Sequence, residues 1–379
     1  MIKPEDLYNY LTKKGIVFYS GVPDSLLKNF CSYVTDNSDH GKHIINSNEG
    51  AAVALAAGHY LSTGKPALVY MQNSGLGNAV NPLLSLADPE VYGIPMLMMI
   101  GWRGEPGKKD EPQHIKQGKV MAGMLDAMGI KYEFLNKETE DFHKIIDILL
   151  DTITKNNCPV ALIISEGTFE NYELKNKDNV CRKDLSLLRE DAIKIIIDNI
   201  SKNDVIVSTT GKTSREVYEY REYKNQGHQN DFLTVGSMGH CSQIALGIAL
   251  EKKDRQVFVI DGDGSVIMQM GSLAICGSEA PVNFKHLVIN NGAHDSVGGQ
   301  PTAGFEISFT EAAKACGYKF ISAAENEMEI KIEFSKLLES RGPSFLEIKV
   351  NKGSREDLGR PASTPQHNKE EFMKFLQTE

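Results

Sequence analysis

Two short stretches, Gly262-Asp263-Gly264-Ser265 and Asn290-Asn291-Gly292-Ala293, decide the fold class of this chain. Each follows a compact apolar run, at 256–260 and 286–289, and such runs are typical of buried parallel strands. An aspartate and an asparagine are therefore expected at the carboxyl ends of two strands, where open α/β sheets bind ligands. Strand and helix patterns alternate along the rest of the chain, which predicts an α/β protein with doubly wound parallel sheets.

The residue types in these two turns predict a metal-bound diphosphate as the ligand. A carboxylate, an amide oxygen and a backbone carbonyl form the hard oxygen set that Mg²⁺ prefers. Gly262 and Gly264 let the backbone approach phosphates, and a helix from about Ser265 to Cys276 is expected to point its first N–H groups at them. The alternative is two ordinary βα turns, in which glycine and asparagine are common.

Composition excludes several classes of function. A chain of 379 residues with a net charge of −9 is expected to form about two domains and to lack the basic face of a nonspecific nucleic-acid binder. The longest apolar stretch, near 95–100, is too short to span a membrane. The six cysteines show no Cys-x-x-Cys spacing and the N-terminus has no signal-peptide core, so a cytoplasmic protein with reduced thiols is predicted.

The strand patterns divide the chain into two halves of similar size. The first is expected to hold strands near 16–20, 43–46, 67–71, 96–100, 131–135 and 160–165. The second is expected to hold strands near 205–208, 232–235, 256–260, 286–289, 320–323 and 345–350. We therefore predict a first domain over 1–169, a charged linker over 170–183, and a second domain over 184–379 that ends in a polar tail and a short helix.

A second group of residues lies in the first half. The alanine-rich stretch 48–58 predicts a helix that ends near Gly64, and Glu49 falls in its first turn. Taken alone, Glu49 is most simply a carboxylate that complements the helix dipole.

Taken together, these features resemble the thiamine-diphosphate enzymes. In that family a Gly-Asp-Gly turn and a double asparagine hold Mg²⁺ and the cofactor's diphosphate, and a glutamate at the start of an alanine-rich helix contacts the pyrimidine. The resemblance implies thiamine diphosphate and Mg²⁺ as cofactors. It assigns Asp263, Asn291 and the Ala293 carbonyl to the metal, and Glu49 to the pyrimidine N1′, where it promotes formation of the reactive carbanion of the cofactor.

Other turns match the same family in register. Gly236 and Met238 follow the strand at 232–235, and the resemblance assigns them to the 4′-amine and to the bent shape of the cofactor; core packing is the alternative for Met238. Gly211 and Thr213 resemble the turn on the diphosphate side, whereas Gly262, Gly264 and Ser265 resemble the diphosphate cradle itself. A Walker A loop is rejected because position 206, where that motif needs glycine, is isoleucine.

The short linker leaves no room for the middle Rossmann-like domain of most thiamine-diphosphate decarboxylases. The segments 20–25, 72–78, 104–114 and 290–300 resemble the two-domain branch that acts on phosphonopyruvate or sulfopyruvate. The resemblance implies a carboxy-lyase that converts phosphonopyruvate to phosphonoacetaldehyde and CO₂ in phosphonate biosynthesis. The alternatives are a sulfopyruvate decarboxylase that gives sulfoacetaldehyde, another thiamine-diphosphate enzyme including a carboligase, a noncatalytic subunit, and an unrelated nucleotide binder.

The substrate implied by this branch is strongly anionic, so its site needs cations. The loop 102–114 offers Arg103, Lys108, Lys109 and His114, and the alternative is a solvated surface loop. The resemblance makes Asp24 and His114 candidates for proton transfer, and Asp24 also a candidate for substrate contact. His294, three residues after Asn291, lies near the metal by sequence and is a candidate contact for substrate or phosphate. Asp24 could equally be a helix N-cap. Arg355 and Arg360 in the tail are further candidates for the anion.

The resemblance also implies a homo-oligomer. In this family the cofactor lies between the first domain of one subunit and the second domain of another, so we predict at least a dimer with active sites at subunit interfaces.

Overall fold

The computed structural model describes residues 1–175 and 185–378 and divides the chain into two compact units, Met1–Lys177 and Asp178–Glu379. Of the predicted linker, residues 176–183 lie outside the described part. Residues 170–175 pack on the first unit: the Glu170 N–H donates to the Ile2 carbonyl at 2.9 Å, and the Tyr172 hydroxyl donates to Asp36 at 3.1 Å. The linker at 170–183 and the domain borders at 169 and 184 stay predictions.

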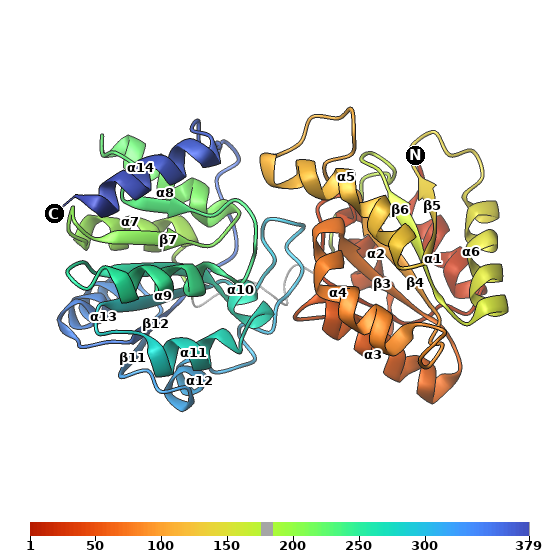
Figure 1. Cartoon of the computed structure of the whole chain (residues 1–379), viewed down its shortest axis with the longest axis horizontal. Helices are drawn as coiled ribbons and strands as arrows, with labels where there is room; N and C mark the ends of the chain where they lie inside the picture. The colour runs from red at the N-terminus through yellow and green to blue at the C-terminus, as the bar shows by residue number, and fades with distance from the viewer. Residues whose placement is uncertain (176–184, 379) are drawn as a thin grey trace. The chain divides into compact units, whose positions relative to one another are not determined.

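The first unit is a six-stranded parallel sheet with helices on both faces (Figure 1). Its strand order is β2-β1-β3-β4-β6-β5. The strands are β1 (Tyr19–Gly21), β2 (His43–Ile45), β3 (Ala67–Gln72), β4 (Met96–Gly101), β5 (Lys131–Leu135) and β6 (Pro159–Ile164). The helices are α1 (Pro4–Lys13), α2 (Lys28–Asn37), α3 (Glu49–Thr63), α4 (Leu76–Pro82), α5 (Pro112–Ala127) and α6 (Phe142–Asn156), with a 3₁₀ turn η1 (Asn73–Gly75) and a π turn η2 (Leu83–Ala87).

Two apolar cores hold this unit together, one on each face of the sheet. Helices α1, α2 and α6 cover one face, and α3, α4 and α5 cover the other. Strands β4 and β6 are buried along their whole length, which explains why they read as continuous apolar runs rather than as an alternating pattern.

The second unit repeats this architecture. Its strands are β7 (Val205–Ser208), β8 (Asp231–Leu233), β9 (Val257–Gly262), β10 (Phe284–Asn290), β11 (Phe320–Ala324) and β12 (Ser344–Lys349). Its helices are α7 (Arg189–Asn199), α8 (Lys212–Tyr223), α9 (Cys241–Glu251), α10 (Asp263–Met268), α11 (Ser272–Glu279), α12 (Phe309–Ala315), α13 (Glu327–Glu339) and α14 (Pro365–Gln377). Helices α7, α8 and α13 cover one face of the sheet, and the remaining helices cover the other.

The strand order of this second sheet, read from its far edge, is β8-β7-β9-β10-β12-β11. Counted from the first strand of each unit, the two sheets have the same order, and all their strand pairs are parallel. The prediction of two doubly wound parallel sheets, with no third domain between them in the described part of the chain, is confirmed.

The segment after β9 differs from the expectation. The prediction of a single helix over about 265–276 is wrong, because the chain forms two helices, α10 and α11, with a break between Gln269 and Gly271. Gln269 leaves the helical region with ψ 46°, and Gly271 begins the next helix as its N-cap. The helix begins earlier than expected, at Asp263, so the predicted metal ligand is itself a first-turn residue.

Candidate active site

The two turns that carry the diphosphate motif lie at neighbouring strand ends. Strand β9 ends at Gly262 and β10 ends at Asn290, and the two strands pair in parallel with Gly262 opposite Ile289. Because the carboxyl ends of parallel strands meet at one edge of the sheet, the structure brings Asp263 and Asn291 to the same place.

Asp263 is a buried carboxylate, 3% exposed, that accepts a hydrogen bond from the Thr302 hydroxyl. Burial raises its pKa to about 6, although the hydrogen bonds from Thr302 and from the backbone of Asn291 act in the opposite direction. Among the described residues Asp263 has no basic partner. A bound cation would therefore stabilise the ionised form of this carboxylate, so the site fits the metal that the family uses.

The two asparagines have different environments. Asn290 is fully buried and its amide donates to the Gly304 carbonyl at 2.7 Å and to Glu347 Oε1 at 2.8 Å, so it fixes the loop. Asn291 Oδ1 accepts the N–H of Ala293 at 3.1 Å. No cluster of three or more His, Cys, Asp or Glu suited to a metal is found in the described residues, so a metal here depends on amide and backbone oxygens beside Asp263.

The turns after β7, β8 and β9 are tied together by Ser265. Its hydroxyl oxygen accepts from the Thr209 hydroxyl at 3.0 Å and from the Gly239 N–H at 3.1 Å. A Cβ on Gly264 would lie 3.4 Å from Met238 Cε and 3.2 Å from the His294 ring, so these three predicted site residues meet. Burial lowers the pKa of His294 to about 4, which keeps its ring neutral.

The remaining predicted cofactor residues of the second unit follow the neighbouring strands β7 and β8. Gly211 is the N-cap of α8 and Thr213 is buried in its first turn, while Gly236 lies in the turn after β8. Each therefore follows the carboxyl end of β7 or β8, at the edge that also carries Asp263.

In the first unit, Glu49 is the first residue of α3. Asn48 caps this helix by accepting the Ala51 N–H at 2.9 Å, and Gly64 ends it with φ 68°, as predicted. Glu49 is 5% exposed, and Oε2 accepts a 2.7 Å hydrogen bond from the Asn78 amide. A Cβ on Gly75 would lie only 2.2 Å from Oε1, so the close packing of Glu49 requires glycine at that position.

Asp24 is fully buried near the carboxyl ends of β1 and β3. Its carboxylate accepts from the Gln72 amide at 2.7 Å and from the Leu26 N–H at 2.9 Å. Burial raises its pKa, while the hydrogen bonds and the charge of Arg103 act against that rise. The N-cap of α2 is Leu27, so Asp24 stabilises the turn before the helix rather than the helix end itself.

The loop after β4 is organised by Asp110. Its carboxylate receives the Arg103 guanidinium, the Gly104 N–H at 2.7 Å, and His114 Nδ1 at 2.9 Å. Burial alone would raise the pKa of Asp110, but the hydrogen bonds from Arg103 and His114 hold it well below its usual range. The other Arg103 nitrogen donates to Ser25 at 2.7 Å, so this guanidinium is engaged within the protein.

The other predicted cations are more exposed. Lys108 pairs with Glu105 at 2.8 Å and Lys109 is exposed. Arg355, in the tail, contacts Glu190, Glu219 and Asp357. Arg355 therefore contacts three carboxylates, whereas Lys108 contacts one.

Three residues of the candidate sites in the two units were not predicted from the sequence: Thr302, Asp110 and Asn78. Thr302 and Asn78 contact predicted residues that are distant in the chain, whereas Asp110 contacts His114 only four positions away, a spacing that gave a local signal.

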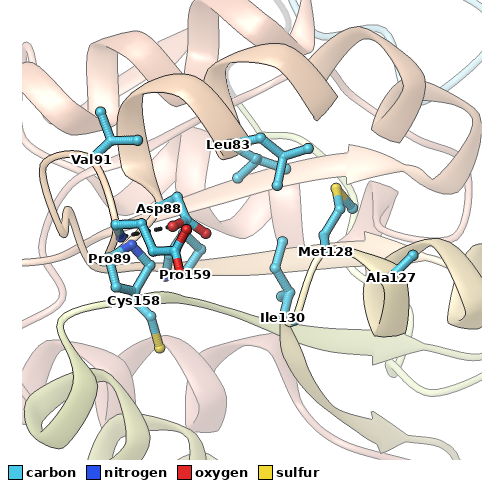
Figure 2. Close-up of a pocket in the computed structure, with 12 residues that line it drawn as sticks. Leu83, Asp88, Pro89, Val91, Ala127, Met128, Ile130, Cys158 and Pro159 are labelled. Atoms are coloured by element: carbon cyan, nitrogen blue, oxygen red, sulfur yellow. Dashed lines mark hydrogen bonds between the residues drawn. The ribbon is translucent and has the colours of Figure 1, made fainter.

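A surface hollow of about 500 Å³ lies elsewhere in the first unit (Figure 2). Its lining includes Ile130, which precedes β5, and Cys158 and Pro159, where β6 begins. It therefore lies at the amino ends of the strands, whereas Asp24 and Glu49 follow carboxyl ends, and it is separate from the candidate site.

Known families match both units. The model described as "Thiamine pyrophosphate enzyme, N-terminal TPP binding domain" matches residues 4–121, and "Thiamine pyrophosphate enzyme, C-terminal TPP binding domain" matches residues 209–348. The class defined by this fold and site is therefore that of the thiamine-diphosphate enzymes.

Similar proteins place the chain within one branch of this class. A phosphonopyruvate decarboxylase of Streptomyces viridochromogenes is 33% identical, with 100% of this chain and 96% of the relative covered. A sulfopyruvate decarboxylase of Methanosarcina acetivorans is 27% identical, with 99% and 98% covered. In Methanocaldococcus jannaschii the sulfopyruvate decarboxylase subunits beta and alpha are 39% and 33% identical over 40% and 45% of this chain, and cover 77% and 96% of their own lengths. The chain belongs to the thiamine-diphosphate-dependent decarboxylase family that contains these proteins.

As for membranes, none of the helices in the described residues combines the length and apolar character that a bilayer crossing demands.

Proposed function

We propose that this chain decarboxylates phosphonopyruvate and releases CO₂ and phosphonoacetaldehyde. The observation that carries the proposal is the similarity along the whole chain to a phosphonopyruvate decarboxylase, at 33% identity against 27% for the full-length sulfopyruvate decarboxylase. In the reaction the bond between the carboxylate and the keto carbon breaks, and a proton is added to that carbon to give the aldehyde.

In this proposal Asp263, Asn291 and the Ala293 carbonyl hold Mg²⁺. The backbone at Gly262, Gly264 and Ser265 lies against the diphosphate, and Gly211, Thr213, Gly236 and Met238 line the rest of the cofactor. The burial of Asp263 without a basic partner in the described residues supports this assignment. When bound, thiamine diphosphate supplies the electron sink for cleavage of the carboxylate.

In this proposal the first unit supplies the residues that transfer protons. Glu49 is buried and held by Asn78, so it is placed to share a proton with the pyrimidine N1′. Burial favours the protonated form of Asp24, which suits it to donate a proton to the product carbon. His114 is held at Nδ1 by Asp110, which leaves Nε2 as the nitrogen that exchanges a proton with substrate.

The phosphonate needs positive charge, and the loop after β4 supplies it. Arg103 is fixed by Asp110 and Ser25, and we assign to it a positioning charge, with Lys108 and Lys109 as more exposed contacts and His294 as a neutral one. Asp24 completes the proposed substrate contacts.

We also propose a homo-oligomer, at least a dimer, in which each active site combines the first unit of one subunit with the second unit of another. The chain matches both cofactor-binding domain models, and the sulfopyruvate decarboxylase of Methanocaldococcus jannaschii has separate alpha and beta subunits, each similar to part of this chain, which supports assembly between such halves.

Sulfopyruvate decarboxylation is the second candidate, because one full-length relative has that name. The two activities share every step and differ only in the anionic group. The same assay therefore decides between them.

The test is CO₂ release from phosphonopyruvate, sulfopyruvate and pyruvate, each with and without thiamine diphosphate and Mg²⁺. Cofactor-dependent turnover that is highest with phosphonopyruvate supports the proposal. A preference for sulfopyruvate would replace the substrate and keep the mechanism. Turnover of pyruvate alone would exclude substrates that carry a second anionic group.

A further inference from the structure

Residues 292–302, after the double asparagine, fold back into a short hairpin. The Thr302 N–H donates to the Gly292 carbonyl at 2.9 Å, the His294 N–H donates to the Gln300 carbonyl at 2.8 Å, and Ala293 pairs with Pro301 between them. In an antiparallel pair, residues directly opposite each other point to the same side, and next-nearest residues share that side. The side chains of His294, Gln300 and Thr302 therefore lie on one face of the hairpin.

That face covers the turn that begins α10. The Thr302 hydroxyl donates to Asp263 Oδ2, and the His294 ring lies 3.2 Å from the position a Cβ would take on Gly264. Because Gln300 is opposite His294, its side chain leaves the hairpin on this same face.

Gln300 is fully buried, and neither Nε2 nor Oε1 has a hydrogen-bond partner in the part of the chain that the structure describes. Gly298 leaves space for the Gln300 amide, because a Cβ at Gly298 would lie 2.9 Å from Gln300 Oε1. Buried amides are nearly always paired, and leaving one unpaired costs stability. A buried, unpaired amide beside the predicted diphosphate cradle therefore indicates a missing ligand atom.

We propose that Gln300 is a ligand-binding residue whose amide Nε2 donates a hydrogen bond to a phosphoryl-type oxygen held beside Asp263 and Gly264. An amide suits this position better than a lysine, because a cation there would pair with the Asp263 carboxylate and compete with a metal. The oxygen comes either from the diphosphate of the cofactor or from the phosphonate of the substrate. The second source rests on the proposed function, whereas the first does not.

Two variants of the full chain test the proposal. Gln300→Met keeps the length of the side chain and removes the amide, and Gln300→Glu replaces the donor with an anion. Gln256→Met is the matched control, since Gln256 also has a buried oxygen without a partner but directly precedes β9, at the opposite end of the strand from the cradle.

The first measurement is thermal unfolding with and without thiamine diphosphate and Mg²⁺, together with calorimetric binding of the cofactor, and neither depends on turnover. For the cofactor source, Gln300→Met raises the Tm of the cofactor-free protein, reduces the Tm gain on cofactor addition, and weakens cofactor binding about tenfold. Gln300→Glu weakens it further, and Gln256→Met leaves it unchanged.

The second measurement is steady-state decarboxylation at saturating cofactor. For the substrate source, cofactor binding by Gln300→Met equals that of the wild type, whereas KM for phosphonopyruvate rises about tenfold and KM for pyruvate, which lacks the phosphonate, does not change. If both cofactor affinity and the KM values of Gln300→Met and Gln300→Glu match those of the wild type, the proposal is overturned. A protein that binds cofactor normally but turns over no 2-keto acid would refute the proposed function instead, since the binding result stands by itself.

Discussion

The two units use the same sheet in different ways. In each, the polar residues of the site follow the first four strands. In the first unit the titratable groups are each held by a complementary side chain, whereas the second unit also leaves two buried groups without one. Asp24 is held by Gln72, Glu49 by Asn78, and His114 by Asp110. In the second unit Asp263 is buried without a cation and Gln300 without a partner, in the described part of the chain.

This difference indicates how the two halves work. Hydrogen bonds fix the positions of proton-carrying groups before any ligand arrives, which is what proton transfer requires. Unpaired buried groups instead lower the stability of the empty protein and are satisfied when the ligand binds. Substitutions in the first unit should therefore act on turnover, and substitutions in the second on cofactor binding.

The largest effect is expected for Glu49→Gln. The variant removes the carboxylate that shares a proton with N1′ but retains the side-chain volume, so kcat should fall by about 10²–10⁴-fold, as for the loss of a general acid–base group. Cofactor affinity from calorimetry should change little. A large loss of cofactor affinity with unchanged kcat would show that Glu49 belongs to binding and would break the comparison.

Asp263→Asn is the counterpart in the second unit. It removes the charged oxygen proposed as a direct ligand of Mg²⁺. Mg²⁺-dependent binding of thiamine diphosphate should therefore weaken by at least about a hundredfold, because even residues that only support a metal's ligands are each worth about 10–100-fold. The cofactor-free variant should be at least as stable as the wild type in urea, because a buried carboxylate is replaced by a neutral amide. Unchanged binding in a calorimeter would exclude Asp263 as a ligand.

A mixture of these two variants tests whether the halves of a site come from different subunits. Each hybrid dimer would hold one site with both substitutions and one site with neither, so random exchange should restore about a quarter of wild-type activity. The variants are unfolded and refolded together, with each refolded alone as the control. Activity no greater than the sum of the controls, despite mixed dimers in native mass spectrometry, would place each site within one subunit.

A smaller effect is expected for Asp110→Asn. The amide cannot match the carboxylate that accepts from Arg103, Gly104 and His114, so His114 loses its fixed orientation and kcat should fall about tenfold. Glu105→Gln, in the same loop, removes one negative charge as Asp110→Asn does and is the control for charge alone. If Asp110 acts through His114, the pH profile of kcat shifts in Asp110→Asn and not in Glu105→Gln; equal profiles would leave Asp110 with a purely structural role.

The smallest effect concerns pH. Burial raises the pKa of Asp24 in the folded protein, so the folded state binds a proton more tightly than the unfolded state. Its contribution to stability is present below the ordinary pKa of an aspartate and is lost as pH rises through the raised value. The free energy of unfolding of the wild type minus that of Asp24→Asn should therefore decline from acid to neutral pH, as measured in urea. A difference that grows with pH would mean that the ionised form is favoured.

Much of this arrangement follows from local sequence. The apolar runs before Gly262 and Asn290 predicted β9 and β10, and parallel strands bring their carboxyl ends together, so the meeting of Asp263 and Asn291 was predictable. Alanine propensity and Gly64 likewise predicted α3 and therefore the place of Glu49.

The remainder depends on contacts that no short pattern encodes. Asp110 reaches Arg103 only because the loop folds back on itself, and Thr302 reaches Asp263 only through the hairpin after β10. The break before Gly271 also escaped prediction, because the apolar pattern continues across it while the backbone does not. Tertiary hydrogen bonds and backbone geometry decide these features.

The repeated strand order has a consequence for inheritance. Each sheet is covered on both faces by its own helices and buries its own two cores, so a coding sequence can be divided between the units without cutting through a core. Gene fission and gene fusion then become nearly neutral events for folding. Sulfopyruvate decarboxylases that exist both as one chain and as separate subunits are what such freedom would leave behind.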